Sequence, residues 1–242
     1  MEIAFDPEGE QAELREYLRE RYDEDRLRRY QETLDREWAE CGDEGAFYRR
    51  SEGYLYNLTA FAMTRTKEPY LRELARHLAP GARVLDYGCG IGSDGLLLLA
   101  AGYRVEFADF DNPSTAYLRW RLERRGVEAP VHDLDRGVPG GFDAAYAFDV
   151  IEHVEDPFAF LAELEERAAL VEVNFLEPEP GDQDLHHELP VPKLVRHAAR
   201  RRLVSYRVLH GRSHLVLYRP ERAGPLGRAA ARARITRARL LN

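Results

Sequence analysis

Three glycines at alternate positions follow an acidic residue in the stretch Val84-Leu85-Asp86-Tyr87-Gly88-Cys89-Gly90-Ile91-Gly92. A short apolar run precedes Asp86, and another apolar run, 96–101, begins soon after Gly92. This order predicts a strand, a tight turn and the start of a helix. Glycine lacks a Cβ and tolerates positive φ, so a ligand can lie against the backbone beside the free N–H groups of the helix. The turn is therefore the predicted cofactor site.

The glycine turn has features of two kinds of nucleotide site. Residues 90–95 match the dinucleotide fingerprint G-x-G-x-x-G, and Asp109 lies about 20 residues further on, where that fingerprint has its acid. In the dinucleotide fold, however, the first glycine follows the strand directly. Here the acidic Asp86 comes first, and a carboxylate repels a pyrophosphate but attracts an ammonium or sulfonium group. The sequence therefore favours S-adenosylmethionine, which has both cationic groups, over a nicotinamide dinucleotide.

Strands and helices are predicted to alternate along the middle of the chain. This alternation is typical of an α/β fold: a Rossmann-like, doubly wound, mostly parallel sheet with helices on both faces. After it, two short strands around Gly211 predict an antiparallel C-terminal hairpin, which brings the sheet to seven strands. The predicted strands are 83–86, 104–108, 130–134, 142–148, 170–175, 203–209 and 215–218, and the predicted helices include 93–101, 113–125, one that begins at Pro157, and 192–202.

The segments outside this pattern set the predicted domain boundaries. Residues 1–66 are predicted to form a helical N-terminal extension with a break near Tyr22-Asp23, either packed on the main domain or acting as a lid. Residues 67–220 are predicted to form the central domain. The basic tail, 221–242, alternates Arg with Ala and predicts a helix or a solvated, partly disordered end, with contact to a protein or nucleic acid as the lesser alternative.

The composition limits the compartment and the partners. The chain has 242 residues, a net charge of -8 and two cysteines, Cys41 and Cys89. A general nucleic-acid binder needs a basic footprint, so nucleic acid is an unlikely partner on this charge balance. Isolated cysteines fit a reducing cytoplasm, and no apolar run approaches the roughly 20 residues of a membrane helix. We therefore expect a cytoplasmic protein with no membrane partner; the sequence leaves the oligomeric state open.

Several motifs in order resemble those of the class I S-adenosylmethionine-dependent methyltransferases that act on small molecules. The stretch 84–92 resembles motif I of this family, and Asp109 resembles the acid that ends its second strand. Asp133-Leu134 resembles the pair that meets adenine, and 142–157 is similar to the fourth-strand motif. The resemblance covers roughly 69–175, and it implies that 67–220 is a methyltransferase domain.

The resemblance implies a role for each matched residue. The three glycines let the backbone approach the methionine part of the cofactor, and Asp86 orients the turn. Asp109 accepts hydrogen bonds from the ribose hydroxyls, while Phe110 flanks the adenine and Asp133 accepts from its amino group. The predicted cofactor-binding residues are Asp86, Gly88, Cys89, Gly90, Gly92, Asp109, Phe110, Asp133, Leu134 and Asp149.

Methyl transfer needs an aligned acceptor, and a general base where the acceptor must lose a proton. The predicted catalytic residues lie after the fourth and fifth strands: Asp149, His153, His186 and His187. The predicted substrate-binding residues are Tyr54, Tyr56 and His186. We predict no metal site, because adjacent histidines in an extended segment point to opposite faces.

The sequence therefore predicts an enzyme that transfers the methyl group of S-adenosylmethionine to an oxygen, nitrogen or carbon nucleophile of a small molecule. One alternative is another use of the same cofactor, by elimination or cyclisation. A second is a non-catalytic partner subunit that keeps the fold, and a less favoured third is an NAD(P)-dependent oxidoreductase. The acceptor itself is not identified by any motif.

Overall fold

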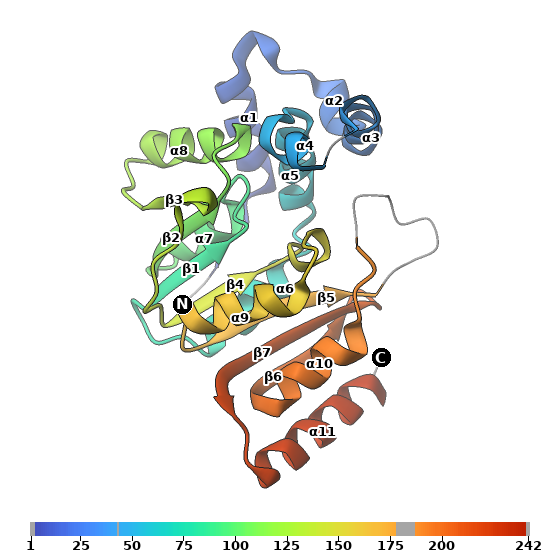
Figure 1. Cartoon of the computed structure of the whole chain (residues 1–242). Helices are drawn as coiled ribbons and strands as arrows, with labels where there is room; N and C mark the ends of the chain where they lie inside the picture. Colours follow the sequence, from blue (N-terminus) through green and yellow to red (C-terminus); the bar gives the residue numbers. More distant parts are fainter. Residues whose placement is uncertain (1–2, 43, 178–186, 241–242) are drawn as a thin grey trace. The chain divides into compact units, whose positions relative to one another are not determined.

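The computed structural model describes residues 3–42, 44–177 and 187–240 (Figure 1). Its strands form a seven-stranded sheet in the order β3-β2-β1-β4-β5-β7-β6. The chain divides into two compact units, one made of 1–81 and 86–138 and the other of 82–85 and 139–242. The central strand β1 (Arg83–Tyr87) contributes to both units. The predicted α/β class and the seven-stranded, mostly parallel sheet are confirmed.

In the first unit, two parallel strands and three helices follow β1. Strands β2 (Arg104–Asp109) and β3 (Val131–Asp133) pair so that Asp109 lies opposite Asp133. Helix α7 (Ser93–Ala100) follows the glycine turn, α8 (Pro113–Arg125) follows β2, and the short helix η2 (Leu134–Arg136) follows β3. The α8 boundaries match the prediction, because Asn112 caps its start and a left-handed Gly126 ends it.

The N-terminal region of this unit is helical, as predicted. The chain turns near Tyr22-Asp23, where the Asp23 side chain accepts hydrogen bonds from the next helix. The helices of this region are α1 (Pro7–Leu18), η1 (Arg19–Arg21), α2 (Glu24–Arg28), α3 (Tyr30–Cys41), α4 (Glu44–Arg50), α5 (Gly53–Thr64) and α6 (Glu68–Arg76).

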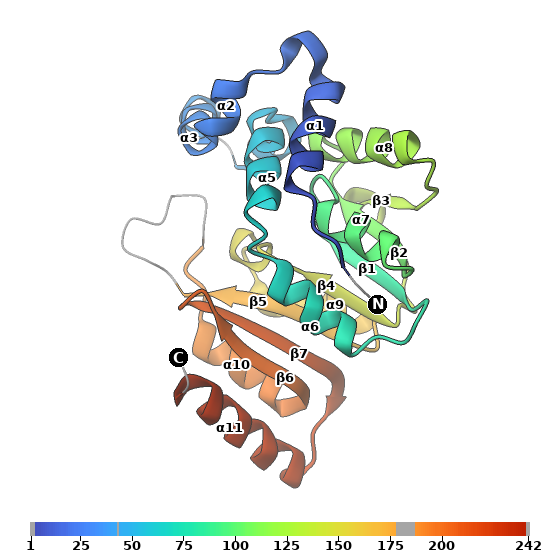
Figure 2. The ribbon, with the colours of Figure 1, turned by 180° about the vertical axis from the view of Figure 1, so that it is seen from behind.

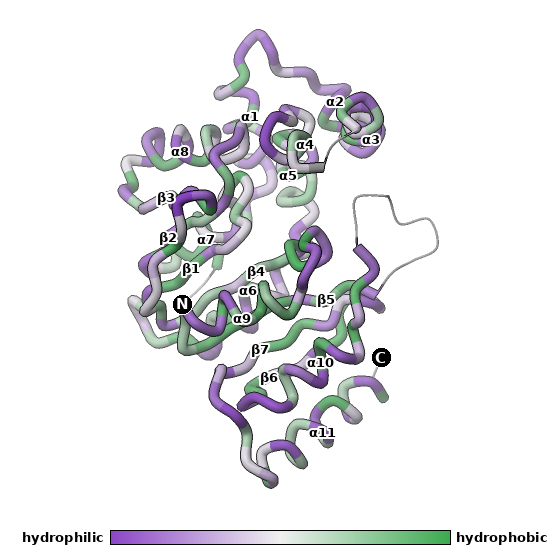
Figure 3. The backbone as a smooth tube through the Cα atoms, viewed as in Figure 1, coloured by the Kyte–Doolittle hydropathy of each residue, from purple (hydrophilic) through white to green (hydrophobic). Residues whose placement is uncertain are grey.

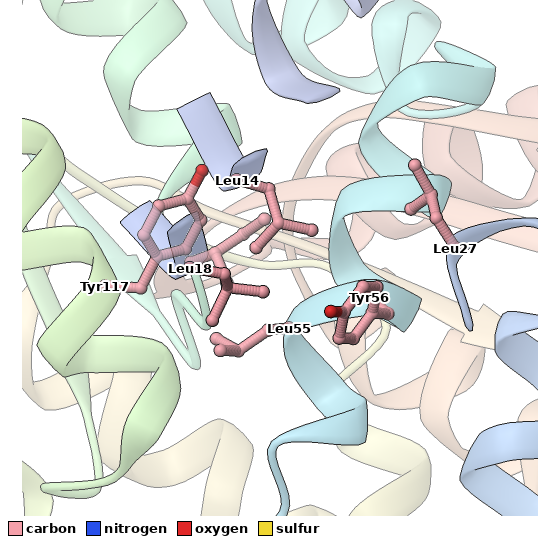
Figure 4. Close-up of a cluster of buried hydrophobic side chains, with 7 residues drawn as sticks. Leu14, Leu18, Leu27, Leu55, Tyr56 and Tyr117 are labelled. Carbon is pink, nitrogen blue, oxygen red and sulfur yellow. The ribbon is translucent and has the colours of Figure 1, made fainter. Parts of the chain in front are cut away.

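A buried apolar cluster joins these helices to the glycine turn. Figure 4 shows side chains from α1, α2, α5 and α8 that converge on one another. Full burial of one leucine contributes about 1.5–3 kcal/mol, so the cluster is a substantial part of this unit's stability. Its buried members are Leu14, Leu18, Leu27, Leu55, Tyr56, Ile91 and Tyr117, of which Ile91 belongs to the turn.

A buried arginine, Arg121 of α8, also ties α1 to the turn. Its Nε donates to Glu13 at 2.8 Å and its Nη2 donates to Glu10 at 2.7 Å. Its Nη1 donates to the Ile91 carbonyl and to the Ser93 hydroxyl, each at 2.9 Å. Burial alone would raise the pKa of Glu13, but the hydrogen bond from Arg125 and the charge of Arg121 outweigh it, and the pKa is lowered. The charged network is therefore satisfied although Arg121 is fully buried.

In the second unit, two parallel strands are extended by an antiparallel hairpin. Strand β4 (Ala144–Ala147) pairs with β5 (Val171–Leu176), and β5 pairs with β7 (Ser213–Arg222), which pairs with the edge strand β6 (Arg201–Leu209). All four residues of β4 are buried, and Figure 3 shows the hydrophobic colour along β4. The predicted C-terminal hairpin is confirmed.

The helices of the second unit begin where they were predicted to begin, to within one residue, but one of them ends earlier. Helix α9 (Pro157–Arg167) begins at the Asp156 cap with proline in its first turn, and a short helix η3 (Ile151–His153) precedes it. Helix α10 (Val191–Arg200) ends two residues before the predicted end at 202. The reason is that Arg201 and Arg202 pair with β7 and so belong to strand β6.

The basic tail forms a helix, α11 (Pro225–Leu240), rather than a disordered end. It lies beside β6 and α10, as Figures 1 and 2 both show. Arg234 of α11 donates to the Leu203 carbonyl at 3.0 Å and to the Val204 carbonyl. The register of β6 shifts between Leu203 and Ser205, so Arg234 satisfies carbonyl groups at an irregular point of the edge strand.

We predict that Arg121→Met lowers the free energy of unfolding by about 3–5 kcal/mol, because it removes the fully buried guanidinium that pairs with both Glu10 and Glu13. Urea unfolding followed by circular dichroism measures this loss. Arg124→Met is the matched control: Arg124 also contacts Glu13 but is more than a third exposed, so its loss is expected to cost under about 1 kcal/mol. Equal stability losses in the two variants would contradict this account of the network.

Candidate functional site

The glycine turn after β1 has the backbone shape that its sequence predicts. Gly88, Gly90 and Gly92 all lie in the left-handed region, with φ of 72°, 52° and 73°. The Gly88 N–H donates to the Ala108 carbonyl at 2.8 Å, which holds the turn against the end of β2. A Cβ on Gly92 would come within 2.3 Å of Leu118, so both its conformation and its surroundings require glycine.

Asp86 lies at the end of β1 and is buried. Its carboxylate faces the first turn of α7, since a Cβ on Gly95 would come within 2.8 Å of Asp86 Oδ2. An anion near a helix N-terminus is stabilised by the helix dipole. Asp86 therefore places negative charge beside the glycine turn, as the prediction of a cationic cofactor requires.

Asp109, at the end of β2, directly holds the turn. Its Oδ2 accepts a hydrogen bond from the Gly90 N–H at 2.7 Å, and its Oδ1 accepts one from the Phe110 N–H at 2.7 Å. Burial raises the pKa of Asp109 to about 6, while these two hydrogen bonds act to lower it. Each carboxylate oxygen has a second lone pair, so Asp109 can hold the turn and still accept from a ligand hydroxyl.

Cys89 lies within the turn but is not a nucleophile. Burial raises the pKa of its thiol well above the ordinary value, and the charges of Asp109 and Asp86 raise it further. The thiol therefore stays protonated at neutral pH. That both carboxylates act on Cys89 also shows that they flank the same turn, where they would oppose a pyrophosphate.

An arginine that the sequence prediction missed, Arg49 of α4, lies over Phe110. Its guanidinium is 4.5 Å from the centroid of the Phe110 ring, and it makes a bidentate ion pair with Asp135 at 2.6 and 3.0 Å. The Tyr48 carbonyl accepts a hydrogen bond from the side chain of Asn112. Helix α4 therefore spans the residues that follow β2 and β3, where the adenine is predicted to bind.

Asp133 and Leu134 lie at the end of β3, next to the predicted adenine position. The Asp133 side chain accepts from the Asp135 N–H at 3.1 Å and pairs with Arg136 at 3.2 Å. These contacts fix the carboxylate at the start of η2 beside the half-buried Leu134. The role of the pair toward adenine stays a prediction.

The two tyrosines predicted to bind substrate have different surroundings. Tyr56 is buried. Its hydroxyl accepts a hydrogen bond from the Asp23 N–H at 3.0 Å and donates one to the Arg21 carbonyl at 3.2 Å. These contacts give Tyr56 a structural role, and we leave it out of the proposed substrate site. Tyr54 lies in an aromatic group with Phe47 and Tyr48, with edge-on ring contacts at 5.6 and 5.5 Å.

In the second unit, Asp149 after β4 is held in an unusual conformation. Its φ is 55°, in the left-handed region that few non-glycine residues occupy. Asn174 of β5 holds it there: the Asp149 N–H donates to Asn174 Oδ1 at 2.8 Å, and Asn174 Nδ2 donates to Asp149 Oδ1 at 2.7 Å. A backbone strained in this way and doubly anchored is typical of a functional position.

Asn174 itself was absent from the predicted site. It is fully buried in β5, a strand whose other buried residues are apolar except Glu172. A polar side chain in such a strand is the signal that would have identified it.

Two of the three predicted histidines, His153 and His187, are described, and both lie near the residues that follow β4. His153 ends η3 and is half-buried, and the His187 N–H donates to the Glu152 carbonyl at 2.7 Å. His187 is exposed, so its imidazole is accessible. His186 lies outside the described residues, and its predicted roles in catalysis and substrate binding stay untested predictions. Among the residues described, no group of three or more acidic, His or Cys side chains is arranged to hold a metal ion.

Comparison with known proteins places the chain in a family. A family model described as "Methyltransferase domain" matches residues 22–209, well over half of the chain. The ubiquinone biosynthesis O-methyltransferase of Xanthomonas campestris pv. campestris (strain B100) is 35% identical over 92 residues, which are 36% of this chain and 38% of that protein. The chain thus spans less than half the length of this curated relative.

Solved structures agree with this chain in fold. TehB from Haemophilus influenzae aligns with a TM-score of 0.55 and 17% identity over 62% of this chain and 61% of that one. The 1,6-didemethyltoxoflavin-N1-methyltransferase of Burkholderia thailandensis, solved with 1,6-didemethyltoxoflavin and S-adenosylhomocysteine, aligns with a TM-score of 0.52 and 22% identity over 64% and 78%. Together with the family match, the sheet order and the glycine turn confirm the resemblance inferred from the motifs: the chain belongs to the methyltransferase domain family.

Proposed function

We propose that this protein transfers the methyl group of S-adenosylmethionine to an oxygen, nitrogen or carbon nucleophile of a small molecule. The observation that supports this most is Asp109, a buried carboxylate at the end of β2 that holds the Gly90 N–H of a left-handed glycine turn. In this position one carboxylate fixes the turn and is available to a ribose diol. The methyltransferase family match supports the same assignment.

The residues of the first unit fit S-adenosylmethionine group by group. Asp86 and Asp109 favour a ligand with cationic groups, and their charge disfavours a dinucleotide pyrophosphate. Phe110 offers a flat apolar ring for the adenine, and Asp133 offers an acceptor for its amino group. When bound, the sulfonium supplies an activated methyl group, and this chain's residues orient it and exclude water.

The residues of the second unit supply the proposed acid–base chemistry. An acceptor hydroxyl or ammonium must lose its proton as the carbon–sulfur bond of the sulfonium breaks. We propose His153 and the exposed His187 as candidates for the base, because both lie beside the residues that follow β4 and an imidazole nitrogen can accept a proton. Asp149, which Asn174 locks in place, is proposed to position the acceptor or the cofactor rather than to take the proton.

A small acceptor is proposed on two grounds. The curated relatives that match are named as ubiquinone biosynthesis O-methyltransferases, and one structural neighbour was solved with a small heterocycle. The negative net charge of the chain is unfavourable for a large nucleic acid at the glycine turn. We also propose a reducing, cytoplasmic location, because neither Cys41 nor Cys89 forms a disulfide with a described residue.

Calorimetric titration with S-adenosylhomocysteine and, separately, with NADH distinguishes the proposed cofactor from a dinucleotide. We expect micromolar binding of the first and none of the second. A screen of phenols, amines and carbon acids for S-adenosylhomocysteine release then tests transfer. Binding of NADH without binding of S-adenosylhomocysteine would refute the proposed function.

We predict that Asp109→Ala weakens binding of S-adenosylhomocysteine by about 100-fold or more, since it removes a buried charged acceptor worth roughly 1.5–3 kcal/mol per hydrogen bond. Leu118→Ala, which alters the packing behind the turn and no ligand contact, is the control for loosening of the turn. Calorimetry measures both affinities. Unchanged affinity in Asp109→Ala would remove Asp109 from the ribose site.

The raised pKa of Asp109 predicts a pH dependence of its own. Ribose hydroxyls donate to the ionised carboxylate, so cofactor binding pulls Asp109 toward the charged form, which is lost as the pH falls through about 6. Affinity for S-adenosylhomocysteine is expected to drop about tenfold between about pH 7.5 and pH 5. The stability of the unliganded protein is expected to change in the opposite direction. Burial penalises the charged form of Asp109, so the contribution of this residue to the free energy of unfolding rises as the pH falls from about 6 to about 4. Asp109→Asn is expected to show neither trend.

We predict that replacing the catalytic base lowers kcat by about 10²–10⁴-fold with little change in cofactor affinity. His153→Ala and His187→Ala, assayed separately on the best acceptor from the screen, identify which imidazole is responsible. His197→Ala is the matched control, because the His197 imidazole of α10 pairs with Glu165 of α9. Full activity in both test variants would exclude the two imidazoles from proton transfer.

A further inference from the structure

Positive charge is concentrated at the C-terminal end of the chain. Residues 187–242 contain fourteen Lys and Arg but only two acidic residues, Glu188 and Glu221. The chain as a whole has a net charge of -8, so the rest of it is strongly acidic. An uneven distribution of this kind indicates a surface for an anionic partner that is separate from the rest of the protein's chemistry.

Much of this charge lines a groove between α10 and α11. The groove has a volume of about 410 Å³. Its apolar part includes Val195 and Ile235, and its rims are formed by Arg196 and Arg200 of α10 and by Arg228 and Arg232 of α11. A second hollow of about 480 Å³ shares Arg200 and Arg228 and adds Arg201 and Arg222.

The rim arginines are not neutralised within the part of the chain that the structure describes. There, no carboxylate lies within ion-pair distance of Arg196, Arg200, Arg228 or Arg232. Arg121 of α8 shows the contrast, since two carboxylates contact it. Unneutralised guanidinium groups that face one groove repel each other, and a bound anion relieves this repulsion.

Helix α11 also exposes large apolar side chains. Leu226 and Leu240 of α11 are 88% and 80% exposed, and the exposed Ala230, Ala233 and Arg237 lie between them on the same helix face. The opposite face is seated on the sheet, where Arg234 holds the carbonyl groups of β6. Thus α11 is anchored and still presents to solvent a face that combines two exposed leucines with arginines.

We propose that the surface formed by α10 and α11 binds an anionic phospholipid bilayer. A guanidinium binds a phosphate bidentately, so the rim arginines match lipid headgroups. The exposed leucines match the acyl region just below, and neighbouring arginines can keep their charge at headgroup level. Among the described residues that line the groove none is aromatic, which is unfavourable for the base stacking that single-stranded nucleic acid needs.

This mode of binding needs no spanning helix. None of the described helices is long and apolar enough to cross a membrane. The sequence-based expectation of no membrane partner came from the absence of long apolar runs, and that criterion does not apply to a helix that lies on the surface. The cytoplasmic leaflet is the anionic one, which fits the proposed compartment. The inference does not depend on methyl transfer.

Sedimentation with vesicles tests the inference. The full-length protein is expected to bind vesicles of three parts phosphatidylcholine to one part phosphatidylglycerol, to lose binding as salt is raised, and not to bind phosphatidylcholine alone. The double variant Arg228→Glu, Arg232→Glu is expected to bind about tenfold or more weakly. Leu226→Ser with Leu240→Ser is expected to bind several-fold more weakly.

The matched control reverses two exposed arginines of the first unit, Arg29→Glu with Arg36→Glu, and so changes the net charge equally. It is expected to bind like the wild type, and thermal unfolding shows that all variants are folded. Equal binding to both vesicle types, or equal loss in the control, would overturn the proposal. Displacement from the vesicles by an RNA of about 20 nucleotides or by polyglutamate would also overturn it, in favour of a nucleic-acid or protein partner.

Discussion

The hydrogen bond from the Gly90 N–H to the Asp109 carboxylate is the interaction on which the first unit depends most. It joins the turn after β1 to the end of β2 at 2.7 Å, and it keeps a carboxylate buried that would otherwise favour water. The left-handed glycines allow the turn to reach that carboxylate, and Gly95 allows α7 to begin against Asp86. The cost of burying Asp109 shows in its raised pKa, and a ligand diol would offset part of that cost. The geometry that holds the turn is thus also the geometry proposed to recognise the ligand.

The two units use different means to fix their functional groups. In the first, backbone N–H groups point at a carboxylate, and helices from the N-terminal region pack behind the turn. In the second, a side-chain amide, Asn174, holds both the N–H and the carboxylate of Asp149 in a conformation that a non-glycine residue avoids. Rigid supports of both kinds suit a reaction whose main requirement is alignment of three atoms in a line.

The sequence predicted the sheet and the glycine turn well because their signals are local. Strand ends, proline and asparagine at the start of α8, and glycine at its end each act through neighbouring residues. It missed Arg49, Arg121 and Asn174, because their roles arise from contacts between residues far apart in the chain. It also assigned Tyr56 to the substrate, since a tyrosine with a buried hydroxyl and one with a free hydroxyl look alike in sequence. The order of the tail was left open for a similar reason: the seat of α11 on β6 depends on a register shift that no local pattern shows.

Arg121 has a consequence for how the N-terminal helices behave in solution. It contacts Glu10 and Glu13 of α1 on one side and the Ile91 carbonyl of the turn on the other. A ligand that fixes the turn therefore also favours the docked state of α1, and by thermodynamic reciprocity a docked α1 raises the affinity of the turn for its ligand. Proteolytic sensitivity and amide exchange of the first helix would then report on occupancy of a site that the helix itself need not touch.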